Sequence, residues 1–460
     1  MDEQINIIGN LLQKKNLKNP AAIRRIATEV NDPQTVNSRR VVFHIKREGV
    51  LDTSSCLVLP ITMSGANARL GAYQGALPMI QRCVLRTSSG RIIAEQNDAA
   101  YLMSIYNHFK ADEVVNRRYV IERGVWNSLK YAENGGNVGL AMGLDNGAGD
   151  LLSKYRVSDV AGVNAEYQIR LSMMFPQLWP WTIPVFLLND YLVLDVDFES
   201  DAYLTSVGDN GAAGCATPTI DTTGVKLLTD HIIYNDATMN MLESMSRTSK
   251  GISLVYGNYS VVNNLLTAPT LEGTSTYRRN VGYAGLRVKH MFLHNQKQSN
   301  TLDANQVIGG KIGVSSDSAV VATDNQTLNV RINNINYYNE DKPTKELYTE
   351  VNDCMMTPLN VNLSQFTNGC ADLAYGGQTF GAATSGGLRG SANLLGINFS
   401  FSKVNGTAGN TIQVGNTPVE LLYKRKYSAG ADKDINVNQR IFTCVERILV
   451  IKNGVIMNNF

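Results

Sequence analysis

Two runs of alternating apolar residues, joined by a proline-rich corner, strongly constrain what this chain can fold into. The runs are Tyr167–Met174 and Ile183–Glu199, and Pro176, Pro180 and Pro184 punctuate the sequence around the corner. Apolar residues at every second position are typical of a half-buried β-strand, whereas proline is confined to the edges, starts and bends of a sheet. The pattern therefore predicts β-sheet here and carries no catalytic motif.

The composition indicates a globular protein with room for more than one domain. The chain has 460 residues, 43% of them hydrophobic, which is enough for two or three domains or for two large β-sandwiches. Forty-two Lys and Arg residues against 40 Asp and Glu leave a net charge of +2, so we expect no direct sequence-specific contact with nucleic acid. The charged fraction of 18% favours extensive protein contacts.

Strand patterns recur through most of the chain, with few helical patterns between them. In the first half, VVFHIKREGVLDTSSCLVLPI and LPMIQRCVLRTSSGRIIAE alternate around turn residues, and a helical pattern follows a cap at Asn97 or Asp98. A second helical pattern covers Pro343–Met356. The strands predicted in the second half are Val225–Tyr234, Leu286–Phe292, Leu328–Ile335, Leu395–Phe401, Val419–Tyr427 and Ile441–Val450. The sequence thus predicts an all-β protein with a few inserted short helices.

Shifts in composition divide the chain into four parts. Residues 1–38 are a polar, basic arm with a helical stretch, AAIRRIATEV. We expect this arm to contact a neighbouring subunit, an inner membrane or an accessory protein, or to be an ordinary frayed terminus. Residues 39–205 form a first β block, the glycine-rich residues 206–223 a linker, and residues 224–460 a second block. Because each block combines strands with one conspicuous helix, the sequence predicts an internal structural duplication.

The residue types that carry chemistry are scattered. The six cysteines form no C-x-x-C pair, and His290 and His294 lie on one face of a predicted strand without the glutamate of a zinc motif. The glycine-rich segments 135–150 and 376–396 lack a phosphate-binding lysine arrangement and read as surface loops. We therefore expect free thiols in a reducing compartment and no metal or cofactor. The cysteines are Cys56, Cys83, Cys215, Cys354, Cys370 and Cys444.

One acidic cluster is a candidate site. On a strand, Asp195, Asp197 and Glu199 project from the same face, where three carboxylates could ligate calcium or serve as acid and base. The interpretation we favour is a solvated strand face, or ion pairs with arginines on a neighbouring strand such as Arg170. With no catalytic motif elsewhere, we expect no catalytic residue and no enzymatic activity.

The sequence predicts neither a signal peptide nor a membrane span, because no apolar run reaches about eighteen residues. We therefore expect folding in a cytosolic type of compartment. Five N-x-S/T sequons do not overturn this, since a chain rich in Asn, Ser and Thr produces them by chance.

Three segments carry a family resemblance: FHIKREGVLDTSSCLVLPI, GALPMIQRCVLRTSSGRIIAE and FPQLWPWTIPVFLLNDYLVLDVDFE. They resemble the first jelly roll of double jelly-roll major capsid proteins, particularly those of polinton-like viruses, virophages and related eukaryotic DNA viruses. The resemblance covers about residues 38–200 and implies two consecutive antiparallel jelly-roll β-sandwiches. It also implies homotrimeric, pseudo-hexagonal capsomers that tile an icosahedral shell in the virion, assemble inside the infected host cell, and contact neighbouring capsomers, penton proteins and minor capsid proteins.

Two alternatives remain open at the level of sequence. A penton or minor capsid protein would combine one jelly roll with an unrelated β domain. A carbohydrate-binding β-sandwich could use Trp179 and Trp181 to stack on sugar rings, although tryptophans between prolines in an apolar corner favour hydrophobic packing.

Overall fold

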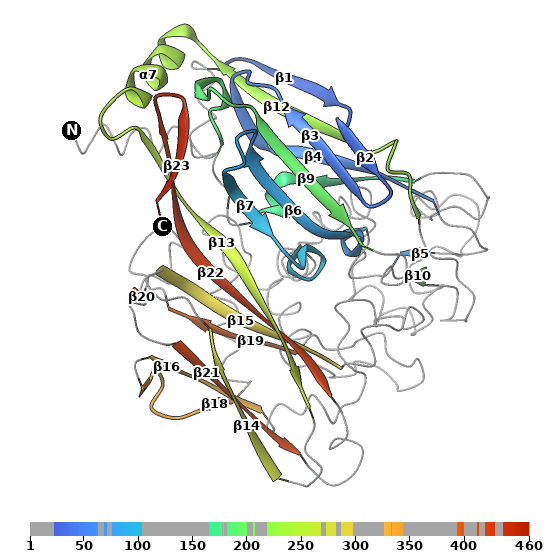
Figure 1. The fold of residues 1–460 in the computed structure, drawn as a ribbon, viewed down its shortest axis with the longest axis vertical. Coiled ribbons are helices and arrows are strands. Elements are labelled where there is room, and N and C mark those ends of the chain that lie inside the picture. The colour runs from blue at the N-terminus through green and yellow to red at the C-terminus, as the bar shows by residue number, and fades with distance from the viewer. Residues whose placement is uncertain are drawn as a thin grey trace.

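Antiparallel strand pairs build the chain into two β-sandwiches that follow one another in sequence (Figure 1). The computed structural model describes residues 23–62, 69–70, 76–103, 165–176, 178, 182–199, 206–207, 219–267, 273–281, 287–297, 326–332, 334–343, 393–399, 412–413, 419–427 and 436–459.

The first sandwich has two facing sheets with the strand orders β1-β12-β4-β8 and β2-β3-β9-β6-β7. Alternation along β9 places Leu194 and Val196 in the core and their neighbours on the outer face. The strands of the first sheet are β1 (Ile23–Asn31), β12 (Lys226–Tyr234), β4 (Val50–Thr62) and β8 (Ala165–Arg170), with the short β11 (Thr219–Ile220) beside β4. Those of the second are β2 (Thr35–Asn37), β3 (Arg40–Ile45), β9 (Leu192–Phe198), β6 (Ile80–Thr87) and β7 (Ile92–Gln96).

The second sandwich begins after helix α7 (Asp236–Ser246), whose first turn is capped by the side chain of Asn235. Its sheets have the orders β13-β22-β15-β19 and β14-β21-β16-β17. The first contains β13 (Ile252–Leu266), β22 (Val437–Lys452), β15 (Arg287–Lys297) and β19 (Asn393–Asn398), with β20 (Ile412–Gln413) and β23 (Val455–Asn459) at its margins. The second contains β14 (Gly273–Asn280), β21 (Val419–Tyr427), β16 (Gln326–Ile332) and β17 (Ile335–Asn336), with β18 (Lys342–Pro343) beside β16.

The two sandwiches share one topology. Numbered along the chain, the principal strands of the first are β1, β3, β4, β6, β7, β8, β9 and β12, and those of the second are β13, β14, β15, β16, β17, β19, β21 and β22. In both, the sheets have the orders 1-8-3-6 and 2-7-4-5. This is the eight-stranded jelly roll, in which two Greek keys wrap into facing sheets. The predicted double jelly-roll fold is confirmed.

The predicted start of the first jelly roll is wrong. The stretch predicted as a helix in the arm forms β1, which pairs with β12 from Ile23 to Asn31, and β2 pairs with β3. Residues 23–37 therefore belong to the sandwich. The β-branched residues Ile26, Thr28 and Val30 suit a strand, and pairing with a neighbour outweighs a helical pattern too short to be stable alone.

The predicted boundary between the blocks is also wrong. Strand β12, predicted as the start of the second block, lies between β1 and β4 and completes the first jelly roll. The glycine-rich stretch 206–223, read as a linker, contains β10 (Ser206–Val207) and β11 and precedes that last strand. Glycine and small polar residues mark a loop within a domain as readily as a boundary, so composition placed the division too early.

The two runs around the proline-rich corner are shorter strands than predicted. The first run is a strand only to Arg170, after which Leu171–Met174 form helix α6. The second becomes a strand at Leu192, after the 3-10 turn η3 (Val185–Leu187) that follows Pro184. Helix α7 and strands β13 and β14 were not among the predicted elements.

Several predicted features can be compared only in part. The helix predicted after Asp98 begins at Ala99 and is described to Met103. The helical pattern after Pro343, the loops 135–150 and 376–396, and Trp179 and Trp181 lie outside the described residues. No helix in the described ranges is long and apolar enough to cross a membrane.

Candidate functional site: a charged ladder and the seam between the jelly rolls

The acidic residues of β9 are held by arginines from the strands on either side. Asp195 accepts hydrogen bonds from Arg40 on β3, at 3.1 Å, and from Arg86 on β6, at 2.8 Å. Asp197 lies 3.6 Å from Arg40 Nε and 3.5 Å from Arg82 Nη1. The predicted ion pairing is confirmed, but its partners are Arg40, Arg82 and Arg86 rather than Arg170, which lies in the opposite sheet.

These pairs continue across the outer face of the sheet as one charged ladder. Arg82 also binds Glu95 on β7 at 2.7 Å, and this hydrogen bond raises the pKa of the guanidinium. The charged ladder therefore runs through Glu95, Arg82, Asp197, Arg40, Asp195 and Arg86, with three charges of each sign. Carboxylates neutralised in this way are poorly suited to bind calcium or to transfer protons. Their effect is to tie β3, β9, β6 and β7 together.

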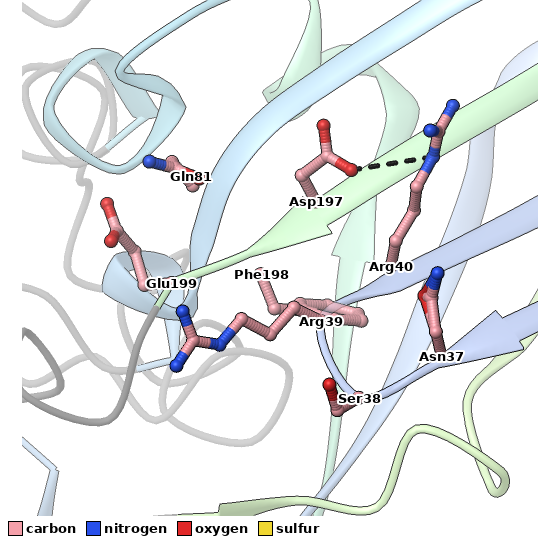
Figure 2. A pocket seen from close by; sticks show the side chains of 8 residues that line it. All are labelled: Asn37, Ser38, Arg39, Arg40, Gln81, Asp197, Phe198 and Glu199. Atoms are coloured by element: carbon pink, nitrogen blue, oxygen red, sulfur yellow. Dashed lines mark ion pairs between the residues drawn. The ribbon is translucent and has the colours of Figure 1, made fainter.

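A polar pocket of about 500 Å³ lies beside the middle of the ladder, where Asp197 and Arg40 line it (Figure 2). Figure 2 shows Asp197 turned toward Arg40 on one side, while Arg39 extends toward the side that carries Glu199. The pocket thus presents both signs of charge. It is lined by Asn37, Ser38, Arg39, Arg40, Gln81, Asp197, Phe198 and Glu199. Across the described ranges, no three His, Cys, Asp or Glu side chains gather as metal ligands.

The two histidines of β15 are buried in the second jelly roll. His290 Nε2 lies 2.5 Å from the hydroxyl of Tyr259, and burial lowers the pKa of this histidine to about 3. The ring of His294 packs 5.6 Å from that of Tyr101, which belongs to the first jelly roll. Cys444 on β22 lies opposite His290 in the register of the two strands, and burial raises the pKa of its thiol to about 12. A buried neutral imidazole and an un-ionised thiol are structural groups rather than a reactive pair.

Strand β7 of the first jelly roll packs on β13 of the second, as Figure 1 shows. The hydroxyl of Tyr256 donates to the backbone carbonyl of Ile93, and the backbone N–H of Glu95 donates to Asn258 Oδ1 at 3.3 Å. Buried apolar side chains form one continuous cluster through both sandwiches. The seam between the jelly rolls is therefore a packed interface in which polar groups of one partner satisfy the backbone of the other.

A second part of the seam forms where the helix that begins at Ala99 meets the sheet of β13, β22 and β15. Arg440 on β22 is only 9% exposed and donates to the hydroxyl of Tyr101 at 2.9 Å. Its guanidinium carbon lies 3.6 Å from the centre of the Tyr101 ring. Asp98 lies 4.0 Å from Arg440 Nε and accepts from Asn263 at 2.9 Å. A buried cation needs such partners, so this cluster fixes how the two jelly rolls meet.

Sequence reasoning missed the seam because its partners are far apart along the chain. Arg440 and Tyr101 are separated by 339 positions. The only local signal was the helical pattern after Asp98, which did not indicate the part of the chain on which the helix packs. Tyr101, which belongs to this helix, is buried against the second jelly roll.

No family model matches the chain, and no curated protein matches it significantly. Solved structures do match over most of its length. The capsid of the virus PBCV-1 is 10% identical, covering 95% of this chain and 97% of that one, with a TM-score of 0.58. The major capsid protein of Faustovirus is 11% identical, with 94% and 92% covered and a TM-score of 0.54. That of mavirus is 10% identical, with 96% and 93% covered and a TM-score of 0.52.

The repeated strand order and the packed seam define a two-jelly-roll protein. The matched structures carry the same overall fold at low sequence identity and extend over nearly the whole of both chains. The chain therefore has the double jelly-roll fold of these viral major capsid proteins.

Proposed function

We propose that this chain is a major capsid protein of a DNA virus and acts as a structural protein of the virion. The observation that carries the proposal is the duplication itself, in which one strand order occurs twice and the two copies are joined by a packed seam. The similar folds of the PBCV-1, Faustovirus and mavirus proteins support it. The charged ladder and the buried histidines support a structural role rather than an enzymatic one.

The assembled unit we propose is a homotrimer. Three copies of a chain with two similar lobes give six lobes around a threefold axis, a shape that can tile a surface with hexagonal packing. The seam supports this geometry, because six lobes are evenly placed only if the two lobes of each chain keep a fixed position and orientation relative to each other. Stable interfaces of this kind bury about 2,000 Å² or more. A low fraction of charged residues limits the desolvation cost of such burial.

We further propose that such capsomers contact one another and the penton and minor capsid proteins of an icosahedral shell. The penton alternative predicts one jelly roll and an unrelated domain, which does not fit two sandwiches of identical topology. The carbohydrate-binding alternative depends on Trp179 and Trp181, which lie outside the described residues. Because residues 23–37 belong to the first jelly roll, we propose a contact between the arm and a neighbouring subunit or an inner membrane only for residues 1–22.

The mass of the purified protein in solution tests the homotrimer. Light scattering on a size-exclusion column should give about 150 kDa, three times the 50.4 kDa of one chain. A pentamer would move the assignment to the penton. A monomer at micromolar concentration would contradict the proposed assembly unit.

A further inference from the structure

The C-terminal end of the second jelly roll reaches back to the first. Strands β13 and β22 pair along their whole length, from Leu266 with Val437 to Ile252 with Ile451. Strand β15 accompanies β22 only as far as Val445, and β23 then takes its place beside the end of β22. Figure 1 shows this hairpin of β22 and β23 extending past the other strands of its sandwich and alongside α7.

The hairpin turn, Asn453–Gly454, is seated between two other parts of the chain. The carbonyl of Gly454 accepts from the backbone N–H of Asn189 at 2.8 Å, and that of Asn453 accepts from Asn189 Nδ2 at 3.3 Å. On its other side, the N–H of Asn453 donates to the carbonyl of Ser246, at the end of α7, at 3.0 Å. Arg47 donates to the carbonyl of Asn189 and so holds the receiving segment in place.

The turn has a conformation that makes this fit possible. Asn453 and Gly454 have φ angles of +50° and +80°, which is typical of a tight Asn-Gly hairpin turn. A Cβ added at Gly454 would lie 2.5 Å from Asn189 Cγ and 2.6 Å from Asn189 Nδ2. Glycine is therefore required twice, for its backbone angle and for the close approach of Asn189.

From these contacts we infer that Asn189, Ser246 and the turn Asn453–Gly454 form a clasp that fixes the second jelly roll to the first. The clasp joins the last strand pair of the chain to the first jelly roll and to the helix that connects the two. It lies near the Arg91 side chain, which donates to the carbonyl of Ile456 in β23. All but one of the clasp's hydrogen bonds join backbone groups, so its specificity comes from shape. The inference stands whether or not the chain forms a capsid.

A glycine pair in the chain separates the effect of the clasp from that of backbone strain. Gly90 has φ +91° in a turn of the first jelly roll, and nothing lies within 4 Å of an added Cβ. Gly90→Ala and Gly454→Ala therefore place alanine in similar backbone conformations, but only the second pushes against Asn189. The double variant Gly454→Ala with Asn189→Ala removes the obstructing side chain while keeping the backbone donor of residue 189.

Amide hydrogen exchange of the full-length protein tests the clasp. In Gly454→Ala, exchange of peptides covering residues 186–190 and 451–456 should be at least about tenfold faster than in Gly90→Ala, because both ends of the clasp open together. The double variant should recover most of the protection. Equal exchange in the two single variants would overturn the inference, and so would a double variant no better protected than Gly454→Ala. If Gly454→Ala does not fold, Asn189→Ala alone should accelerate exchange at residues 451–456 by less than about tenfold, because only the hydrogen bond from Asn189 Nδ2 to Asn453 is lost. Unchanged exchange there would overturn the inference.

Discussion

Acidification should weaken the second jelly roll through one buried histidine. His290 is enclosed beside Tyr259 and next to Lys289, and burial followed by the lysine charge lowers its pKa from 6.5 to about 3. The folded protein therefore keeps this imidazole neutral, whereas the unfolded chain takes up a proton below pH 6.5. Stability is full above that pH and is lost progressively as the pH falls toward 3.

The size of the loss follows from the two pKa values. Between pH 7.5 and pH 5, protonation of His290 in the unfolded chain shifts the unfolding equilibrium constant by about 1.5 powers of ten. This shift corresponds to a loss of about 2 kcal/mol in the free energy of unfolding. For a domain of about 200 residues this lowers the melting temperature by roughly 4–8 °C. His290→Gln has no titrating group at this position. Over the same pH range, its melting temperature should therefore fall by roughly 4–8 °C less than that of the wild type.

The assay is differential scanning calorimetry of the wild type and His290→Gln at pH 7.5 and pH 5. His44→Gln, at an exposed histidine in the first jelly roll, controls for loss of an imidazole as such. His231, whose pKa is lowered by burial in the first jelly roll, remains in every variant. Its contribution to the pH dependence of the melting temperature therefore cancels when the variants are compared with the wild type. Parallel falls in the wild type and His290→Gln would refute the assignment of this loss to His290.

Three further predictions concern the seam, the core and the thiols. Arg440→Leu should lower the free energy of unfolding by about 2 kcal/mol in urea denaturation, because the hydrogen bond to Tyr101 and the ring contact are both lost; a change below about 0.5 kcal/mol would show that the contact contributes little. Phe43→Ala should cost about 3–5 kcal/mol in the same assay, since its side chain is fully buried, and a loss under 1 kcal/mol would contradict its place in the core. The buried Cys83, whose pKa is raised by desolvation, should react with a thiol reagent much more slowly than the partly exposed Cys56 in the native protein. In urea the two thiols should react equally fast. Equal rates in the native protein would contradict the burial of Cys83.

Local patterns predicted the strands that have a clear inside and outside. β21 was predicted to the residue, and β12 to within one, because apolar and polar residues alternate or cluster between turn residues there. In contrast, β14 reads GTSTYRRN and is largely exposed, so it offers no apolar face to detect. It is a strand because it pairs with β21 over all eight of its residues.

Domain limits and site partners depend on pairings that are distant in sequence. β1 and β12 are about 200 residues apart, yet they pair with each other in one sheet, so no local shift in composition could assign them to one domain. The carboxylates of β9 were visible as a same-face group. Their partners were not, since Arg40 and Arg86 reach Asp195 only once β3 and β6 lie on either side of β9.

Imaging of the purified oligomer by electron microscopy tests the central claim most directly. If three chains each contribute two jelly rolls, particles viewed along their symmetry axis should show threefold symmetry with six lobes around the axis. A ring with fivefold symmetry, or isolated two-lobed particles at concentrations where a capsomer should be stable, would contradict the account.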